Sequence, residues 1–93
     1  MVVGTCVLKI VLPGVQSLKE KRQRLGGLVV RVRRKFNVAC AELEDNDTYN
    51  HATLGLACVS NRRAHAEQVI RSAAEWIESN VDGEVSELLV EIL

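Results

Sequence analysis

The pattern of apolar and polar positions along the chain changes its period repeatedly and divides the sequence into strands and helices. A first stretch rich in β-branched side chains ends at Pro13–Gly14, as expected of a strand followed by a turn. The polar run DNDTYN separates two further apolar stretches, which predicts a hairpin. The four predicted strands cover residues 2–12, 37–44, 51–60 and 84–93.

A helix is predicted between the first two strands. Ser17 is followed three residues later by Glu20, the pattern of a capping box. Gly26 and Gly27 interrupt the pattern at a cost to a helix of roughly 2 kcal/mol relative to alanines, and we expect them to allow close packing against the sheet. The apolar stripe of this helix consists of Leu18, Leu25, Leu28, Val29, Val32 and Phe36.

A second helix is predicted over residues 62–80, with Ser60 or Asn61 as its cap and Gly83 as the break after it. Its apolar stripe is Ala66, Val69, Ile70, Ala73 and Ile77.

The predicted order β-α-β-β-α-β is that of a ferredoxin-like fold. We therefore expect residues 1–93 to form a single α+β domain, with a four-stranded antiparallel sheet and two helices on one of its faces. In the third strand, Thr53, Gly55, Ala57 and Val59 share one parity, and Ala52, Leu54, Leu56 and Cys58 share the other. The sheet face turned away from the helices is less polar than water favours, so a homodimer through this open sheet face is one hypothesis.

Composition places the chain among ordinary globular proteins. It has 93 residues, 47% of them hydrophobic and only three aromatic, so the core must be largely aliphatic. The cysteines Cys6, Cys40 and Cys58 are odd in number and widely spaced, which favours reduced, buried thiols over a disulfide framework. The first residues lack a basic segment and a cleavage pattern, and we expect a cytoplasmic protein that is not membrane-bound.

Charge changes the picture most. The chain has no net charge, yet residues 17–36 hold eight basic and one acidic side chain, a formal charge of +7, and the other residues carry −7. A segregated basic face is the electrostatic footprint of an anion or nucleic-acid partner. The candidate nucleic-acid or anion-binding residues are Lys19, Lys21, Arg22, Arg24, Arg31, Arg33, Arg34 and Lys35.

The position of these cations along the helix separates them into two groups. Arg33, Arg34 and Lys35 fall in the last turn, where the helix dipole favours positive charge. Lys19, Lys21 and Arg22 fall in the first turns, where it disfavours positive charge, so structure alone explains them poorly. Together with the free N–H groups they predict a phosphate site. The alternative is a solvated basic face balanced by surface ion pairs.

Other chemistry is weakly supported. No aromatic residue lies on a predicted strand, so contacts to RNA or DNA are expected at the backbone rather than by base stacking, and Phe36 and Trp76 are expected to pack internally. His51 and His65 have no metal-ligand spacing, and no cofactor motif occurs. A cation site at the acidic residues of the hairpin loop is less favoured than a solvated turn. Those acidic residues are Glu42, Glu44, Asp45 and Asp47.

An enzyme is the least favoured class. Acylphosphatases share this topology and bind a phosphoryl group in the loop after the first strand, and GVQSLKEKR superficially resembles that loop through Gly14, Val15, Gln16 and Arg22. The match lacks the second glycine and a suitably placed asparagine, so we expect no catalytic residues.

The run VLPGVQSLKEKRQRLGGLVVRVRRKFNVACAELEDND, followed by ATLGLACVSN, resembles the YlxP-like family of small bacterial proteins over nearly the whole chain. The most specific parts are SLKEKR, residues 17–22, and Phe36-Asn37-Val38 followed by Glu42. The resemblance implies a ferredoxin-like fold and no established activity. It also implies genes beside those of translation and ribosome maturation, which suggests a ribosomal or RNA context.

Two hypotheses follow. The first is a non-enzymatic module that binds structured RNA, on a ribosomal particle, through phosphate contacts by Lys19, Lys21, Arg22, Arg31 and Arg34. The second is an interaction or regulatory module, dimeric through its sheet, whose basic helix docks on an acidic protein or on the acidic body of another copy. Salt weakens both kinds of complex, but only the first depends on added RNA.

Overall fold

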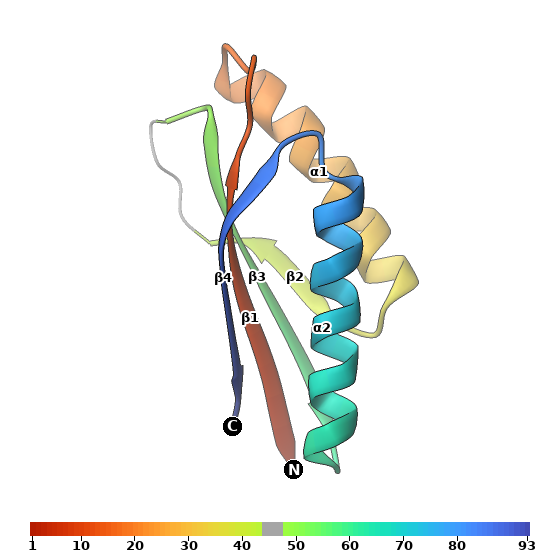
Figure 1. Cartoon of the computed structure of the whole chain (residues 1–93). Coiled ribbons are helices and arrows are strands. Elements are labelled where there is room, and N and C mark those ends of the chain that lie inside the picture. Colours follow the sequence, from red (N-terminus) through yellow and green to blue (C-terminus); the bar gives the residue numbers. More distant parts are fainter. Residues whose placement is uncertain (44–47) are drawn as a thin grey trace.

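The computed structural model describes residues 1–43 and 48–93 and contains four strands and two helices (Figure 1). The elements follow the predicted order β-α-β-β-α-β. Most of their ends agree with the sequence analysis within a residue, but the second strand is shorter than predicted at both ends. The elements are β1 (Val2–Val11), α1 (Leu18–Lys35), β2 (Ala39–Glu42), β3 (His51–Ser60), α2 (Arg63–Asn80) and β4 (Glu84–Ile92).

The strands form one antiparallel sheet in the order β2-β3-β1-β4, and both helices cover the same face of it (Figure 1). The predicted ferredoxin-like α+β fold is therefore confirmed. The two central strands, β1 and β3, pair along their full length from Val2 opposite Ser60 to Val11 opposite His51. The outer strands β2 and β4 leave two sheet edges, and the other face of the sheet is not covered by any described element.

Strand register decides which side chains form the core. In β1 the residues Cys6, Leu8 and Ile10 face the helices and are almost fully buried, and they lie opposite Leu56, Leu54 and Ala52 of β3. The parity that contains Leu54 is thus the inner one, and the parity with Thr53, Gly55 and Ala57 forms the open sheet face. The core is aliphatic as expected, and all three cysteines are buried free thiols.

The first helix begins as predicted. Ser17 is its N-cap, and the Ser17 hydroxyl oxygen accepts a hydrogen bond from the backbone N–H of Glu20 at 3.1 Å. Leu25, Leu28 and Val32 of the predicted stripe are buried, whereas Leu18 and Val29 lie at its half-buried margin. The fourth buried residue of this helix is Lys21, which the apolar pattern did not identify.

The paired glycines of α1 do not pack against the sheet, so that prediction is wrong. Gly26 and Gly27 are exposed, and a Cβ atom built on either one would meet nothing within 4 Å. Their positions lie opposite the buried stripe, because at 100° per residue they fall across the helix from Leu25 and Val32. No internal contact of the described residues compensates their cost to the helix.

The second helix is capped differently from the prediction. Its N-cap is Arg62, without a side-chain capping bond, and neither Ser60 nor Asn61 occupies that position. Ser60 instead accepts a hydrogen bond from the backbone N–H of Arg62 at 3.1 Å and lies 2.9 Å from Nδ1 of His65. The predicted stripe is correct, with Ala66, Ile70, Ala73 and Ile77 fully buried and Val69 partly buried.

No helix in the described part of the chain is long and apolar enough to cross a membrane.

Glycine substitutions test this account of packing. Gly83→Ala should destabilise the fold by about 1–3 kcal/mol, because its Cβ would collide with the carbonyl oxygen of Val11. Gly26→Ala and Gly27→Ala should each stabilise it by about 1 kcal/mol, because both sites are open and helical. Urea unfolding followed by circular dichroism measures both effects, and a destabilising Gly26→Ala would contradict the exposed position.

Candidate functional site

Lys21 is the most deeply buried charged residue among those described, with an exposed fraction of 1%. Its ammonium nitrogen lies 3.1 Å from Oε2 of Glu42 and donates to the carbonyl oxygen of Thr48 at 3.2 Å. The placement of Lys21 on the exposed basic face is therefore wrong. Its position on the helix faces the sheet with Leu25 and Leu28, and a buried ammonium needs the partners that it has found there.

This ion pair joins parts of the chain that are distant in sequence. Lys21 belongs to the SLKEKR segment of α1, and Glu42 is the last residue of β2. Thr48 lies in the connection between β2 and β3, so one ammonium holds the helix to the chain on both sides of residues 44–47. The two segments most specific to the family resemblance are thus in direct contact, which gives them a structural role.

The start of α1, where a phosphate site is expected, contains two internal hydrogen bonds. The Ser17 hydroxyl already accepts the Glu20 N–H, and Oε2 of Glu20 accepts the backbone N–H of Gln16 at 3.2 Å. The Glu20 carboxylate therefore places a negative charge near the positive end of the helix dipole. Val15, in the loop that precedes the helix, is buried.

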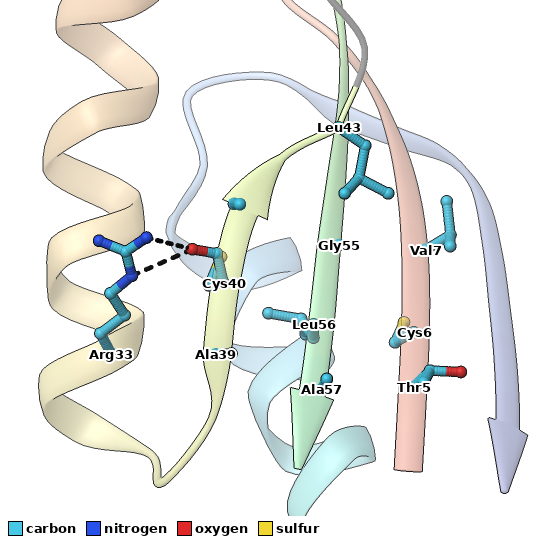
Figure 2. A pocket seen from close by; sticks show the side chains of 11 residues that line it. Thr5, Cys6, Val7, Arg33, Ala39, Cys40, Leu43, Gly55, Leu56 and Ala57 are labelled. Carbon is cyan, nitrogen blue, oxygen red and sulfur yellow. Dashed lines mark hydrogen bonds between the residues drawn. The ribbon is translucent and has the colours of Figure 1, made fainter. Parts of the chain in front are cut away.

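Three further cations of α1 make contacts within the chain. Arg24 lies 3.2 Å from Glu20 and 3.2 Å from Asp82. Arg33 donates from Nε and Nη2 to the carbonyl oxygen of Cys40, at 3.0 and 2.6 Å (Figure 2). The guanidinium carbon of Arg31 lies 5.3 Å from the centre of the Trp76 ring. Arg31 and Arg33 remain exposed, so these contacts orient their charge without removing it from solvent.

The other cations face outward. Lys19, Arg34 and Lys35 are exposed and make no hydrogen bond or ion pair with any part of the chain that the structure describes. Arg22 is exposed as well. We call the surface made by the solvent-facing side of α1 the outer face. Its residues are Lys19, Arg22, Gln23, Gly26, Gly27, Val30, Arg34 and Lys35.

The two large aromatic residues pack internally, as predicted. Phe36 and Trp76 are partly buried against the core, with ring centroids 6.3 Å apart at an interplanar angle of 70°. Neither ring is presented for base stacking on the outer face.

A hollow of about 500 Å³ on the open sheet face was not anticipated (Figure 2). Its floor is made by the small side chains of β2 and β3, and Leu43 closes one end by lying over Gly55. The run of small residues at one parity of β3 was the signal in the sequence. The other residues around the hollow are Thr5, Cys6, Val7, Arg33, Ala39, Cys40, Ala41, Leu56 and Ala57.

Two buried thiols lie beneath this hollow. Burial raises the pKa of Cys6 to about 11, despite an opposing effect of the Arg71 charge. Burial also raises the pKa of Cys40, against the effect of Arg33. Both groups are therefore protonated and poorly nucleophilic near neutral pH.

The remaining candidate groups form no evident centre. Glu42 is paired with Lys21, while Glu44, Asp45 and Asp47 lie outside the described residues. Within residues 1–43 and 48–93, no three His, Cys, Asp or Glu side chains gather as metal ligands. His51 and His65 are exposed.

Comparison with known proteins places the chain in a group without a described activity. Residues 3–90 match the sequence profile of a family described as "Protein of unknown function (DUF503)". The "Uncharacterized protein YlxP" of Bacillus subtilis (strain 168) is 32% identical over 77 residues, which are 83% of this chain and 84% of that protein.

Solved structures support the fold alone. A de novo designed protein with a ferredoxin fold, LFR1 1, is similar with a TM-score of 0.58 and 11% identity, over 100% of this chain and 83% of that one. A variant of SnoaB, a cofactor-independent oxygenase from Streptomyces nogalater, is similar with a TM-score of 0.51 and 15% identity, over 98% and 90% of the two chains. At such identities neither resemblance carries information about activity.

Removal of the Lys21 ammonium tests its structural role. Lys21→Ala should destabilise the fold by roughly 2–4 kcal/mol, because Glu42 and the Thr48 carbonyl lose their partner. Glu42 is 28% exposed in its side chain and recovers part of this by hydration. The control Lys19→Ala should change stability by less than about 0.5 kcal/mol. Equal unfolding midpoints for the two variants in urea would contradict the buried ion pair.

Thiol labelling tests the burial of the cysteines. At pH 8 the thiolate is the reactive form, and the raised pKa values of Cys6 and Cys40 keep it scarce. Iodoacetamide should therefore label both residues slowly in the native protein and rapidly in urea, as read by peptide mass spectrometry. Rapid native labelling of Cys6 would show that the core is more accessible than the structure indicates.

Proposed function

Because this chain belongs to the DUF503 family of proteins of unknown function, we propose a function from the geometry of its first helix: a non-enzymatic module that binds structured RNA through the outer face. The observation that carries the proposal is the set of outward cations around two exposed glycines. The chain uses Lys21 and Arg24 internally, whereas Lys19, Arg34 and Lys35 serve no contact within the described residues.

The dimensions of the outer face fit a polyanion rather than a single small anion. Fifteen residues separate Lys19 from Arg34, which is about 22 Å along a helix at 1.5 Å per residue. Cations at both ends of such a length can contact phosphates several nucleotides apart. No exposed aromatic ring lies between them, so the contacts fit a sugar–phosphate backbone held in a folded RNA.

The exposed glycines support close approach of that backbone. Gly26 and Gly27 lie midway between the outer cations and present no side chain to solvent. Two glycines destabilise the helix by about 2 kcal/mol relative to alanines. No contact within the described residues offsets this loss. A bare stretch of helix lets a bulky phosphate backbone lie against α1 while the longer side chains of Lys19 and Arg34 reach around it.

The charge of the rest of the molecule orients such a complex. The chain outside residues 17–36 carries a formal charge of −7, so its other surfaces repel nucleic acid while α1 attracts it. A protein without net charge can thereby bind RNA in one orientation, and its acidic surfaces disfavour non-specific binding along the RNA. The ribosomal context implied by the family resemblance makes ribosomal RNA and ribosomal subunits the first ligands to test.

Variants of the outer face provide the main test. Lys19→Ala, Arg34→Ala and Lys35→Ala together should weaken binding to ribosomal RNA at least tenfold at moderate salt while leaving the unfolding midpoint nearly unchanged. The slope of log K against log salt should fall by roughly 2–3, because about one counterion is released for each phosphate contact. Filter binding or fluorescence anisotropy across a salt series measures both quantities. Lys21 is excluded from the variant because its loss damages the fold.

A matched control removes three exposed cations elsewhere. Lys9→Ala, Arg62→Ala and Arg71→Ala give the same net charge but leave α1 intact, so binding should fall much less. Equal losses of RNA affinity in the two triple variants would show that net charge alone determines binding. That result would contradict binding through the outer face. Binding of a folded wild type to neither ribosomal RNA nor subunits would overturn the proposal and favour an acidic protein as the partner of α1.

Substitution of the two glycines should have opposite effects on stability and on RNA binding. Gly26→Ala with Gly27→Ala should stabilise the isolated protein, by about 2 kcal/mol in total, yet weaken RNA binding because two methyl groups intrude on the contact. A stabilised variant that binds RNA as tightly as the wild type would show that the glycines have no part in the interface.

A further inference from the structure

The open sheet face carries an apolar surface that lies opposite the helices and is independent of the RNA proposal. Several of its large side chains are exposed, with Val59 at 63%, Leu89 at 57% and Leu43 at 54%. The exposure of neighbouring apolar residues at this extent is typical of an interaction surface. The identity of its occupant follows from the way in which large and small side chains are distributed over it.

Strand register arranges the open sheet face in rows that cross all four strands. The central row contains Leu89 of β4, Val7 of β1, Gly55 of β3 and Ala41 of β2. The next row contains Glu91, Thr5, Ala57 and Ala39 in the same strand order. In both rows the larger side chains stand on β4 and β1, and the smaller ones stand on β3 and β2.

This gradient divides the open sheet face into a ridge and a hollow. Leu89 forms the ridge over β4, while Val7 of β1 borders the hollow and also a smaller one of about 370 Å³ beside Leu89. The hollow of about 500 Å³ lies over β2 and β3, where Ala39, Ala41 and Ala57 are too small to fill the surface (Figure 2). Leu89 and the small side chains of β2 thus lie on opposite sides of the line between β1 and β3.

We propose that a second copy of this chain covers the open sheet face, related by a twofold axis that runs parallel to the strands between β1 and β3. Such an axis preserves the rows and reverses their strand order, so β4 of one copy lies over β2 of the other. Leu89 then enters the hollow over the second copy's Ala41. Val7 packs against the second copy's Leu43, which covers Gly55.

Charges at the rim match the same arrangement. In the neighbouring row, Glu91 of β4 lies over the second copy's Ala39, at the edge where the guanidinium group of Arg33 reaches the carbonyl oxygen of Cys40. The acidic edge strand of one copy therefore meets the basic flank of α1 in the other. The twofold axis forms this contact twice, and the outer face of α1 remains free.

The available area is consistent with a reversible dimer. The four strands contain 10, 4, 10 and 9 residues, and at about 3.4 Å per residue and 4.8 Å per strand they give a face of roughly 540 Å² per copy. Two such faces bury about 1,100 Å², an area typical of weak and transient protein–protein interfaces. Alignment of two twisted sheets in this way is the usual mode of sheet-on-sheet packing.

Sedimentation velocity of nuclease-treated protein, over a range from 1 to about 200 µM, tests the proposal without RNA. The wild type should approach the mass of a dimer at the upper concentrations. Leu89→Lys should weaken association at least tenfold, because it places an ammonium in an apolar hollow. The control Val30→Lys, at an exposed apolar position on α1, should leave the dimer unchanged.

A compensating substitution tests the axis itself. Ala41→Glu alone should also weaken the dimer, whereas Leu89→Lys combined with Ala41→Glu in one chain should restore it, because each new cation then faces a new anion across the axis. A twofold axis perpendicular to the strands would place the two Leu89 positions opposite each other and give no rescue. A wild-type monomer at all concentrations, an unaffected Leu89→Lys dimer or the absence of rescue would each overturn the proposal.

Discussion

The buried contact between Lys21 and Glu42 fixes how the first helix sits against the sheet. An ammonium group with 1% exposure is tolerable only where oxygen atoms replace its water, and here a carboxylate and the Thr48 carbonyl do so. Glu42 ends the short edge strand β2, so the same contact holds that strand to α1. The direction of the remaining side chains of the helix follows from this orientation. Ser17 and Glu20 close its N-terminus, and Lys19 and Arg34 are turned outward.

The basic helix therefore contains cations with different roles. Lys21 is part of the core. Arg24 pairs with Glu20 within the helix and joins the helix to Asp82, and Arg33 donates to a carbonyl oxygen of the edge strand. Saturation of the Cys40 carbonyl protects this edge from unwanted strand pairing. The charge left for a partner is smaller than the sequence total of +7 implies, but it is concentrated on the exposed residues of α1 at both ends of a bare stretch of backbone. That concentration, rather than the total, supports contact with an extended polyanion.

The two proposed interfaces occupy opposite sides of the molecule and are compatible. A dimer through the open sheet face would carry one outer face on each exterior side, which doubles the number of cationic surfaces without a new contact to RNA. Two linked weak sites bind a large ligand more tightly than one, provided that the ligand spans both. The sheet gradient and the outer face of α1 also have different physical origins. The gradient comes from side-chain volume along cross-strand rows, and the outer face comes from outward-facing charge along a helix.

Periodicity in the sequence determined the order of elements, the helical stripes and the buried cysteines, because burial on one face imposes periods of 2 and 3.6 on the apolar residues. The sequence also located the basic segment and the small-residue parity of β3. It could not assign Lys21, because only the folded chain brings Glu42 and Thr48 to a position reached by that helix face. The same limit applied to Gly26 and Gly27, which local pattern placed near the apolar stripe and the tertiary structure placed in solvent. Register between distant strands produced the ridge and the hollow, since Leu89 and Ala41 share a row only after β4 has paired with β1 and β2 with β3.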